Sequence, residues 1–163
     1  MTMAYPLGYA TYHYSVRFNL KMKKEETTDI RMYVPDAKST GTYEVIEISE
    51  CRYKLANNDP FNESLSYGTI IEVETEKIEE DGESKFVFKN IHRKSEFTSE
   101  CIGLPIALKE LEMRVVGQMI IDEGGFWEVL FGGMGFVNLP KKSKLNVIEE
   151  LNKLIIAKKR QQK

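Results

Sequence analysis

The sequence predicts an α+β fold, in which an antiparallel β meander or partial barrel precedes a ferredoxin-like helix–strand–strand–helix unit. Before residue 100, apolar and polar residues alternate with the period of two that half-buried strands show. After residue 100, apolar residues also recur at helical spacing, between further strand-like runs. We expect residues 1–163 to form a single domain, with a mainly β half (1–100) and an α+β half (101–163).

The strands of the first half are predicted from alternation and from turn residues. They are residues 11–20, 43–49, 51–55, 69–75 and 85–91. The polar residues 21–29 indicate a loop, which Pro35-Asp36 continues. A turn over residues 79–82, which contains an Asp-Gly pair, joins the last two strands as a hairpin.

The second half is predicted to begin with a helix that starts at Pro105 and stops at Gly117. Three strands follow, over residues 119–121, 126–131 and 134–139. Ser143 is the predicted N-cap of a terminal helix, whose apolar stripe begins at Leu145.

The net charge of −2 is unevenly distributed along the chain. Residues 141–163 carry +6, so residues 1–140 carry −8. An acidic body of this kind repels nucleic acid and attracts cationic partners. No segment has the pattern of a signal peptide or of a membrane-spanning helix, and the two cysteines, Cys51 and Cys101, are expected to be reduced and buried. These features together predict a cytoplasmic protein that has no membrane partner.

Part of the chain resembles a known bacterial family. The residues that carry the resemblance are Tyr53-Lys54-Leu55, Asn57 or Asn58, Pro60-Phe61 and Leu65-Ser66-Tyr67-Gly68. They are similar to the Tyr-Arg-Leu-x-Asn-x-Pro-Phe and Tyr-Gly-Asp signature of an uncharacterised domain family, although Thr69 stands where that family has its acidic residue. The resemblance extends over residues 43–155. It implies a two-part α+β fold and no particular activity.

The residues needed for common catalytic and metal sites are absent or wrongly spaced. His92 and Cys101 have no third group to orient them, so they do not form a nucleophile–base pair. Zinc ligands at short repeated spacings are missing. The glycines at 132–135 precede a strand pattern rather than the Lys-Ser or Lys-Thr of a phosphate loop. We therefore predict no catalytic residue, no cofactor and no metal ligand.

The leading hypothesis is an immunity-type protein that binds and neutralises a toxin. The supporting residues are the acids of one strand face and of the turn that follows, Glu72, Glu74, Glu76, Glu79, Glu80 and Asp81. These carboxylates would meet a cationic protein surface. Trp127 is either a core residue or the aromatic anchor of that contact.

Two alternatives remain open at this point. One is a nucleic-acid-associated regulator that uses the basic terminal helix. The other is a small metal enzyme that uses the carboxylate row. The oligomeric state is not predicted.

Overall fold

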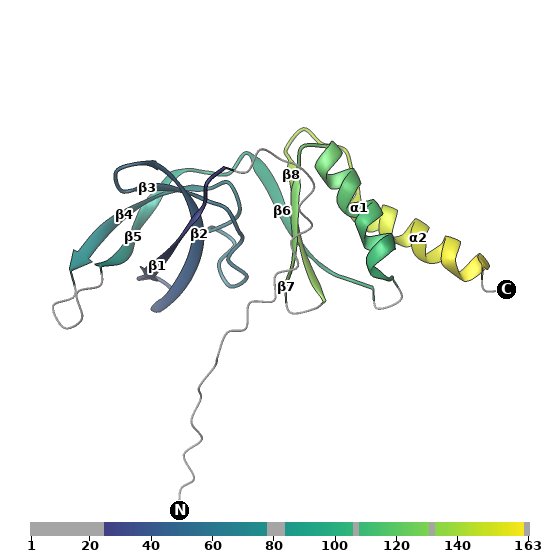
Figure 1. Cartoon of the computed structure of the whole chain (residues 1–163), viewed down its shortest axis with the longest axis horizontal. Coiled ribbons are helices and arrows are strands. Elements are labelled where there is room, and N and C mark those ends of the chain that lie inside the picture. The colour runs from purple at the N-terminus through teal and green to yellow at the C-terminus, as the bar shows by residue number, and fades with distance from the viewer. Residues whose placement is uncertain (1–24, 78–83, 106–107, 131–132, 162–163) are drawn as a thin grey trace, which may run out of the picture.

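The computed structural model describes residues 25–77, 84–105, 108–130 and 133–161, and arranges them in three layers (Figure 1). A closed five-stranded barrel lies at one end, a three-stranded sheet lies beside it, and two helices cover the face of the sheet that points away from the barrel. The α+β class is confirmed. The predicted strand over residues 11–20 and the predicted turn over 79–82 lie outside the described residues.

The barrel contains the first five described strands. They are β1 (Thr28–Val34), β2 (Ser39–Ser49), β3 (Arg52–Leu55), β4 (Ile70–Lys77) and β5 (Ser84–Arg93). Consecutive strands pair antiparallel, and a short parallel pairing of Met32 with Phe86 joins β1 to β5 and closes the barrel. The predicted strands 43–49, 51–55, 69–75 and 85–91 fall within β2 to β5, apart from Cys51 and Thr69 at their starts.

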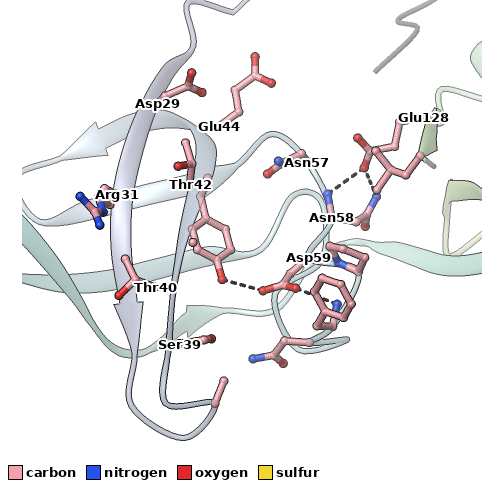
Figure 2. A pocket seen from close by; sticks show the side chains of 17 residues that line it. Asp29, Arg31, Ser39, Thr40, Thr42, Glu44, Asn57, Asn58, Asp59 and Glu128 are labelled. Carbon is pink, nitrogen blue, oxygen red and sulfur yellow. Dashed lines mark hydrogen bonds between the residues drawn. The ribbon is translucent and has the colours of Figure 1, made fainter. Parts of the chain in front are cut away.

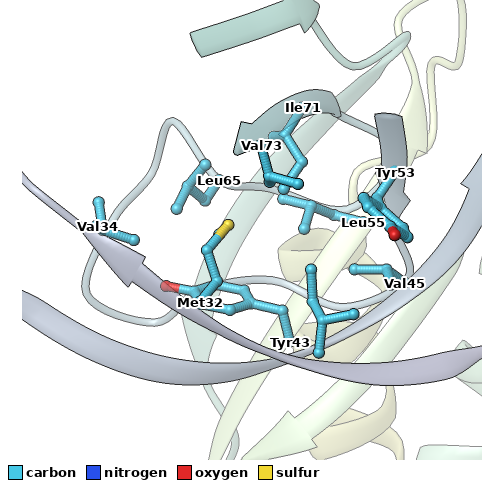
Figure 3. Packing of buried hydrophobic residues seen from close by; sticks show 10 residues of the cluster. Met32, Val34, Tyr43, Val45, Tyr53, Leu55, Leu65, Ile71 and Val73 are labelled. Carbon is cyan, nitrogen blue, oxygen red and sulfur yellow. The ribbon is translucent and has the colours of Figure 1, made fainter. Parts of the chain in front are cut away.

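Alternate residues of these strands form the barrel core (Figure 3). Met32, Val45, Leu55 and Ile71 are fully buried there, and each contributes about 1.5–3 kcal/mol by leaving water. Leu65, from the loop between β3 and β4, is also buried in this cluster. The loop is therefore anchored to the barrel interior.

The sequence predicts a loop over residues 21–29 that continues to Pro35-Asp36. This prediction is wrong from Thr28 to Val34, where β1 lies. Residues 28–34 form a strand in which Ile30, Met32 and Val34 point inward. These apolar residues alternate with Asp29 and Arg31, but the polar residues before them make this alternation hard to recognise in the sequence. Seven consecutive pairings with β2 stabilise this strand.

The second half contains the sheet and both helices. Its elements are β6 (Phe97–Gly103), α1 (Glu110–Asp122), β7 (Phe126–Leu130), β8 (Met134–Pro140) and α2 (Val147–Gln161). The sheet order is β6-β8-β7, and both pairings are antiparallel. The predicted strands 126–131 and 134–139 correspond to β7 and β8, whereas β6 was not predicted.

The predicted start of the first helix at Pro105, its predicted end at Gly117 and the predicted strand over 119–121 are all wrong, and α1 begins at Glu110. Helix α1 passes through Gly117 and includes residues 119–121. A Cβ at position 117 would lie 2.7 Å from Nε1 of Trp127, so glycine is needed there for close packing rather than for termination. The helix ends instead before Gly124, which has the left-handed φ of +78° that is typical of helix ends.

The predicted start of the last helix is also corrected. Oδ1 of Asn146 accepts a hydrogen bond from the backbone N–H of Glu149 (3.1 Å), so Asn146 is the N-cap. Ser143 lies earlier, where its hydroxyl donates to Glu123 at 2.6 Å. Both cysteines are free, but neither is buried as predicted, because Cys51 is partly exposed and Cys101 is exposed. Within the described ranges, neither helix has the length and apolar character needed to cross a membrane.

Candidate binding cleft

A cleft of about 990 Å³ lies between the two halves of the molecule (Figure 2). Its walls are β1 and β2 of the barrel, the loop that follows β3, and β7 of the sheet. The charged side chains that line it are Asp29, Arg31, Glu44, Asp59 and Glu128. The lining therefore contains four carboxylates and one guanidinium, which makes the cleft a negatively charged site.

The barrel wall of the cleft follows from strand alternation. Because Ile30 and Met32 point into the barrel, Asp29 and Arg31 point outward from β1. Glu44 lies directly opposite Asp29 on β2 and is buried. Its Oε1 accepts a hydrogen bond from Oγ1 of Thr27 at 2.7 Å. The chain therefore enters β1 beside a buried carboxylate of the cleft.

Asn58 joins the loop to the second half. Its backbone N–H and its Nδ2 both donate to Oε1 of Glu128, each at 2.9 Å. Its Oδ1 accepts from the backbone N–H of Tyr67 at 3.0 Å. Glu128 is 5% exposed and Asn58 is 4% exposed, so these bonds are protected from water. The position of the Glu128 carboxylate is thereby fixed relative to the loop.

Asp59 connects the loop to the barrel. The hydroxyl of Tyr43 donates to Oδ2 of Asp59 at 2.6 Å. Burial raises the pKa of Tyr43 well above its ordinary range, and the hydrogen bond and negative charge of Asp59 raise it further. Oδ1 of Asp59 accepts from the backbone N–H of Phe61 at 2.8 Å, which forms an Asx turn.

This turn holds an aromatic side chain at the rim of the cleft. The side chain of Phe61 is 90% exposed, which is the highest exposed fraction among the large hydrophobic residues that the structure describes. Pro60 precedes it and restricts the backbone. An exposed aromatic ring beside a polar cleft is typical of an interaction surface.

Asn57 adds a buried acceptor to the same wall. Its Oδ1 is buried and has no hydrogen-bond partner among the residues that the structure describes. Asn57 lies between Glu44 and the loop residues in Figure 2. A buried acceptor of this kind is stabilised when a ligand supplies an N–H donor.

Aromatic rings hold the two halves together beside the cleft. Tyr67 of the loop stacks on Phe126 of β7, with ring centroids 4.5 Å apart, and contacts Phe97 of β6 edge to face. Oγ of Ser95 donates to the backbone carbonyl of Tyr67 at 2.6 Å. Within the stretch 53–68 that carries the predicted resemblance, residues 57–62 form one wall of the cleft and Tyr67 lies at the junction of the halves.

The predicted acidic surface on β4 is accompanied by cations. Glu74 pairs with Lys89 at 3.0 Å, and Glu72 lies 3.8 Å from Lys89 and 3.9 Å from Arg52. These negative charges raise the pKa of Lys89, chiefly through its hydrogen bond with Glu74. Glu76 lies near the end of β4, whereas Glu79, Glu80 and Asp81 lie outside the described residues. The described part of this surface is of mixed sign.

Trp127 is separated from the cleft. It is 6% exposed and packs in the core between the sheet and the helices. Of the two roles left open by the sequence, its position is that of a core residue. The cleft residues were missed because the stretch 57–60 indicates only a turn, and Glu128 lies seventy positions away.

The structure also shows the surroundings of the residues on which the two alternative functions depend. Lys158, one of three bases in the last turn of α2, pairs with Glu112 of α1 at 2.8 Å. Among the described residues, no group of three or more His, Cys, Asp or Glu side chains is arranged to hold a metal ion.

Comparison with known proteins informs the fold. Neither a protein-family model nor a curated protein matches the chain. A crystal structure of a hypothetical protein from Neisseria gonorrhoeae is similar, with a TM-score of 0.51 and 14% sequence identity. The alignment covers 83% of this chain and 91% of that chain. At this identity the similarity concerns the fold alone, and the family signature of residues 53–68 stays a prediction.

Proposed function

We propose that this protein binds a cationic partner protein, and that the cleft between its two halves is the binding site. One observation carries the proposal: four carboxylates and one guanidinium line a cavity of about 990 Å³, and Phe61 is exposed at its rim. The two halves do not close over this space. A site with this lining suits a lysine or arginine side chain flanked by an apolar group.

The cleft would recognise its partner by charge and by apolar contact. The inserted ammonium or guanidinium group would donate to Asp29 and Glu44, and to the buried Oδ1 of Asn57. Phe61 would pack against an apolar side chain next to the inserted cation and exclude water from the contact. Opposite charges accelerate association, and salt weakens it.

Within this proposal, neutralisation of a toxin is the biological role. The negative charge of residues 1–140 supports a cationic partner. The acids of residues 72–81 form a second predicted contact surface, although Arg52 and Lys89 offset part of its charge. We further propose that the second half is a ferredoxin-like unit without its fourth strand, which the sheet order β6-β8-β7 supports.

Binding of the product of the adjacent gene tests the proposal. We expect Asp29→Lys and Phe61→Ala each to weaken binding at least about tenfold, or about 1.4 kcal/mol. Glu100→Lys is the matched control for charge, and Ile48→Ala for an exposed apolar side chain. Both controls lie outside the lining of the cleft.

Glu74→Lys decides between the two acidic surfaces. If binding falls with Glu74→Lys and not with Asp29→Lys, the partner uses the β4 surface and the cleft proposal is wrong. Unchanged binding in Asp29→Lys and Phe61→Ala, in a protein that captures its partner, would also contradict it.

A further inference from the structure

The wall of the cleft that the barrel provides carries charges of both signs. Asp29 and Arg31 lie two positions apart on β1, and both point outward, because Ile30 and Met32 point into the barrel. Glu44 lies directly opposite Asp29 on β2. We propose that the cleft binds a C-terminal lysine or arginine of its partner, with the side-chain cation at Asp29 and Glu44 and the α-carboxylate at Arg31. This inference rests on the proposed function, because it names the group that enters the same cleft.

The negative end of this wall has two carboxylates side by side. Like charges that lie directly opposite each other on paired strands destabilise a sheet, so a cation between Asp29 and Glu44 would remove an unfavourable interaction. The other two carboxylates of the lining, Asp59 and Glu128, already accept hydrogen bonds from β2 or from the loop. We therefore expect the cation at Asp29 and Glu44.

The positive end of the wall consists of hydrogen-bond donors. Thr42 lies directly opposite Arg31, and Thr40 lies two positions before Thr42 on β2, below Asp29 and Glu44 in Figure 2. A guanidinium and hydroxyl groups can all donate to a carboxylate. None of the ion pairs found among the described residues includes Asp29 or Arg31, so these two side chains are not paired with each other. Arg31 would repel a ligand that brings only a cation, whereas it would pair with a ligand that also brings a carboxylate.

The spacing of the two ends fits a single terminal residue. Two positions along a strand span about 6.7 Å, which is the separation of Asp29 and Arg31 along β1. Lysine and arginine have the same number of bonds between the cationic centre and the carboxyl carbon, and an extended side chain places these groups about 7.5 Å apart. An apolar residue before the terminal one would supply the contact with Phe61 that the proposed function requires.

Calorimetric titration of the full-length protein with matched peptides tests the chemistry of the ligand. The probes are acetyl-Gly-Ser-Gly-Leu-Lys with a free C-terminal carboxylate and the same peptide with a C-terminal amide. The amide has the greater positive charge, so attraction to a negative cleft alone would make it bind more tightly. We expect the opposite order, in which the free acid binds about tenfold more tightly than the amide at low salt.

Arg31→Gln tests whether this preference arises at Arg31. It should lower the affinity for the free acid about tenfold, to that for the amide, without weakening the binding of the amide. Arg93→Gln is the matched control, because Arg93 is an exposed arginine of β5 outside the lining of the cleft, and it should keep the preference. If Asp29→Lys weakens the binding of both peptides but the amide binds as tightly as the free acid, the inference is wrong and the proposed function stands.

A third peptide separates a terminal carboxylate from one on a side chain. Acetyl-Gly-Leu-Lys-Ser-Glu with a C-terminal amide has the same net charge as the free acid, and its cation and carboxylate lie two positions apart in an internal segment. We expect it to bind about tenfold more weakly than the free acid. Equal binding would overturn the inference, because the cleft would then accept an internal segment. If none of the three peptides binds, the proposed function fails and the inference fails with it.

Discussion

Asn58 joins the loop of the cleft to the second half of the molecule. It donates twice to the buried carboxylate of Glu128 and accepts from the backbone of Tyr67. Replacement by alanine would remove the side-chain bonds and leave buried polar groups without these partners. We expect Asn58→Ala to lower the free energy of unfolding by about 3 kcal/mol, measured by urea denaturation.

Asn62→Ala is the matched control for Asn58→Ala. Asn62 lies in the same loop, and its side chain accepts one exposed hydrogen bond from Ser64. We expect a loss of less than about 1 kcal/mol from Asn62→Ala. Equal effects of the two substitutions would show that the bridge to Glu128 adds no stability.

Tyr43 makes stability depend on pH in the alkaline range. Burial and Asp59 raise its pKa in the folded protein above the value of about 10 that it has in the unfolded chain. Above pH 10 the unfolded chain therefore loses a proton that the folded protein keeps, so the stability contributed by Tyr43 is present below pH 10 and decreases above it. Tyr43→Phe should decrease this slope, measured as urea midpoints between pH 8 and pH 11. If the dependence of the urea midpoint on pH is unchanged in Tyr43→Phe, groups other than Tyr43 cause the loss of stability above pH 10.

At the scale of elements, α1 shows how packing overrides a local signal. Alanine is normally favoured over glycine within a helix by about 1 kcal/mol. At position 117, however, a Cβ would lie 2.7 Å from Nε1 of Trp127, so the ring or the helix would have to shift. We expect Gly117→Ala to destabilise the protein by about 1–3 kcal/mol in thermal or urea unfolding.

Gly103→Ala provides the comparison for that prediction. No atom lies within 4 Å of a Cβ added at Gly103, so its effect should stay within about 0.5 kcal/mol. A stabilising effect of Gly117→Ala would show that Trp127 moves at little cost.

The same elements show what the sequence could and could not predict. The alternation of apolar residues located β2, β4 and β5, because strand periodicity is a local property. It did not reveal β6, whose residues are mostly exposed and carry little apolar alternation. Glycine at position 117 locally favours a helix end, whereas its close contact with Trp127 forms only in the folded structure. Of the cleft, the turn at 57–60 was predictable, whereas its contact with Glu128 depends on how the halves meet.

At the scale of the whole molecule, two separate cores are joined by a small junction. The barrel and the second half have their own buried clusters. Tyr67, Phe97 and Phe126 provide the aromatic contacts between them. Because Trp127, the only tryptophan, belongs to the second core, its fluorescence reports on that half.

We therefore expect Tyr67→Ala to uncouple the unfolding of the two halves. In the unmodified protein, the urea midpoints from tryptophan fluorescence and from far-UV circular dichroism should coincide. In Tyr67→Ala they should separate, since the loss of the stacked ring weakens the junction. Separate midpoints already in the unmodified protein would contradict the prediction of one cooperative domain.

The central claim is that a cation binds in the cleft between the halves, and amide chemical-shift mapping tests it most directly. The full-length ¹⁵N-labelled protein is titrated with a lysine-rich peptide at low salt. We predict that shifts concentrate in β1, β2, the loop at 57–62 and β7, and that they disappear at high salt. Shifts that concentrate on β4 and β5 instead, with the cleft unaffected, would contradict the claim.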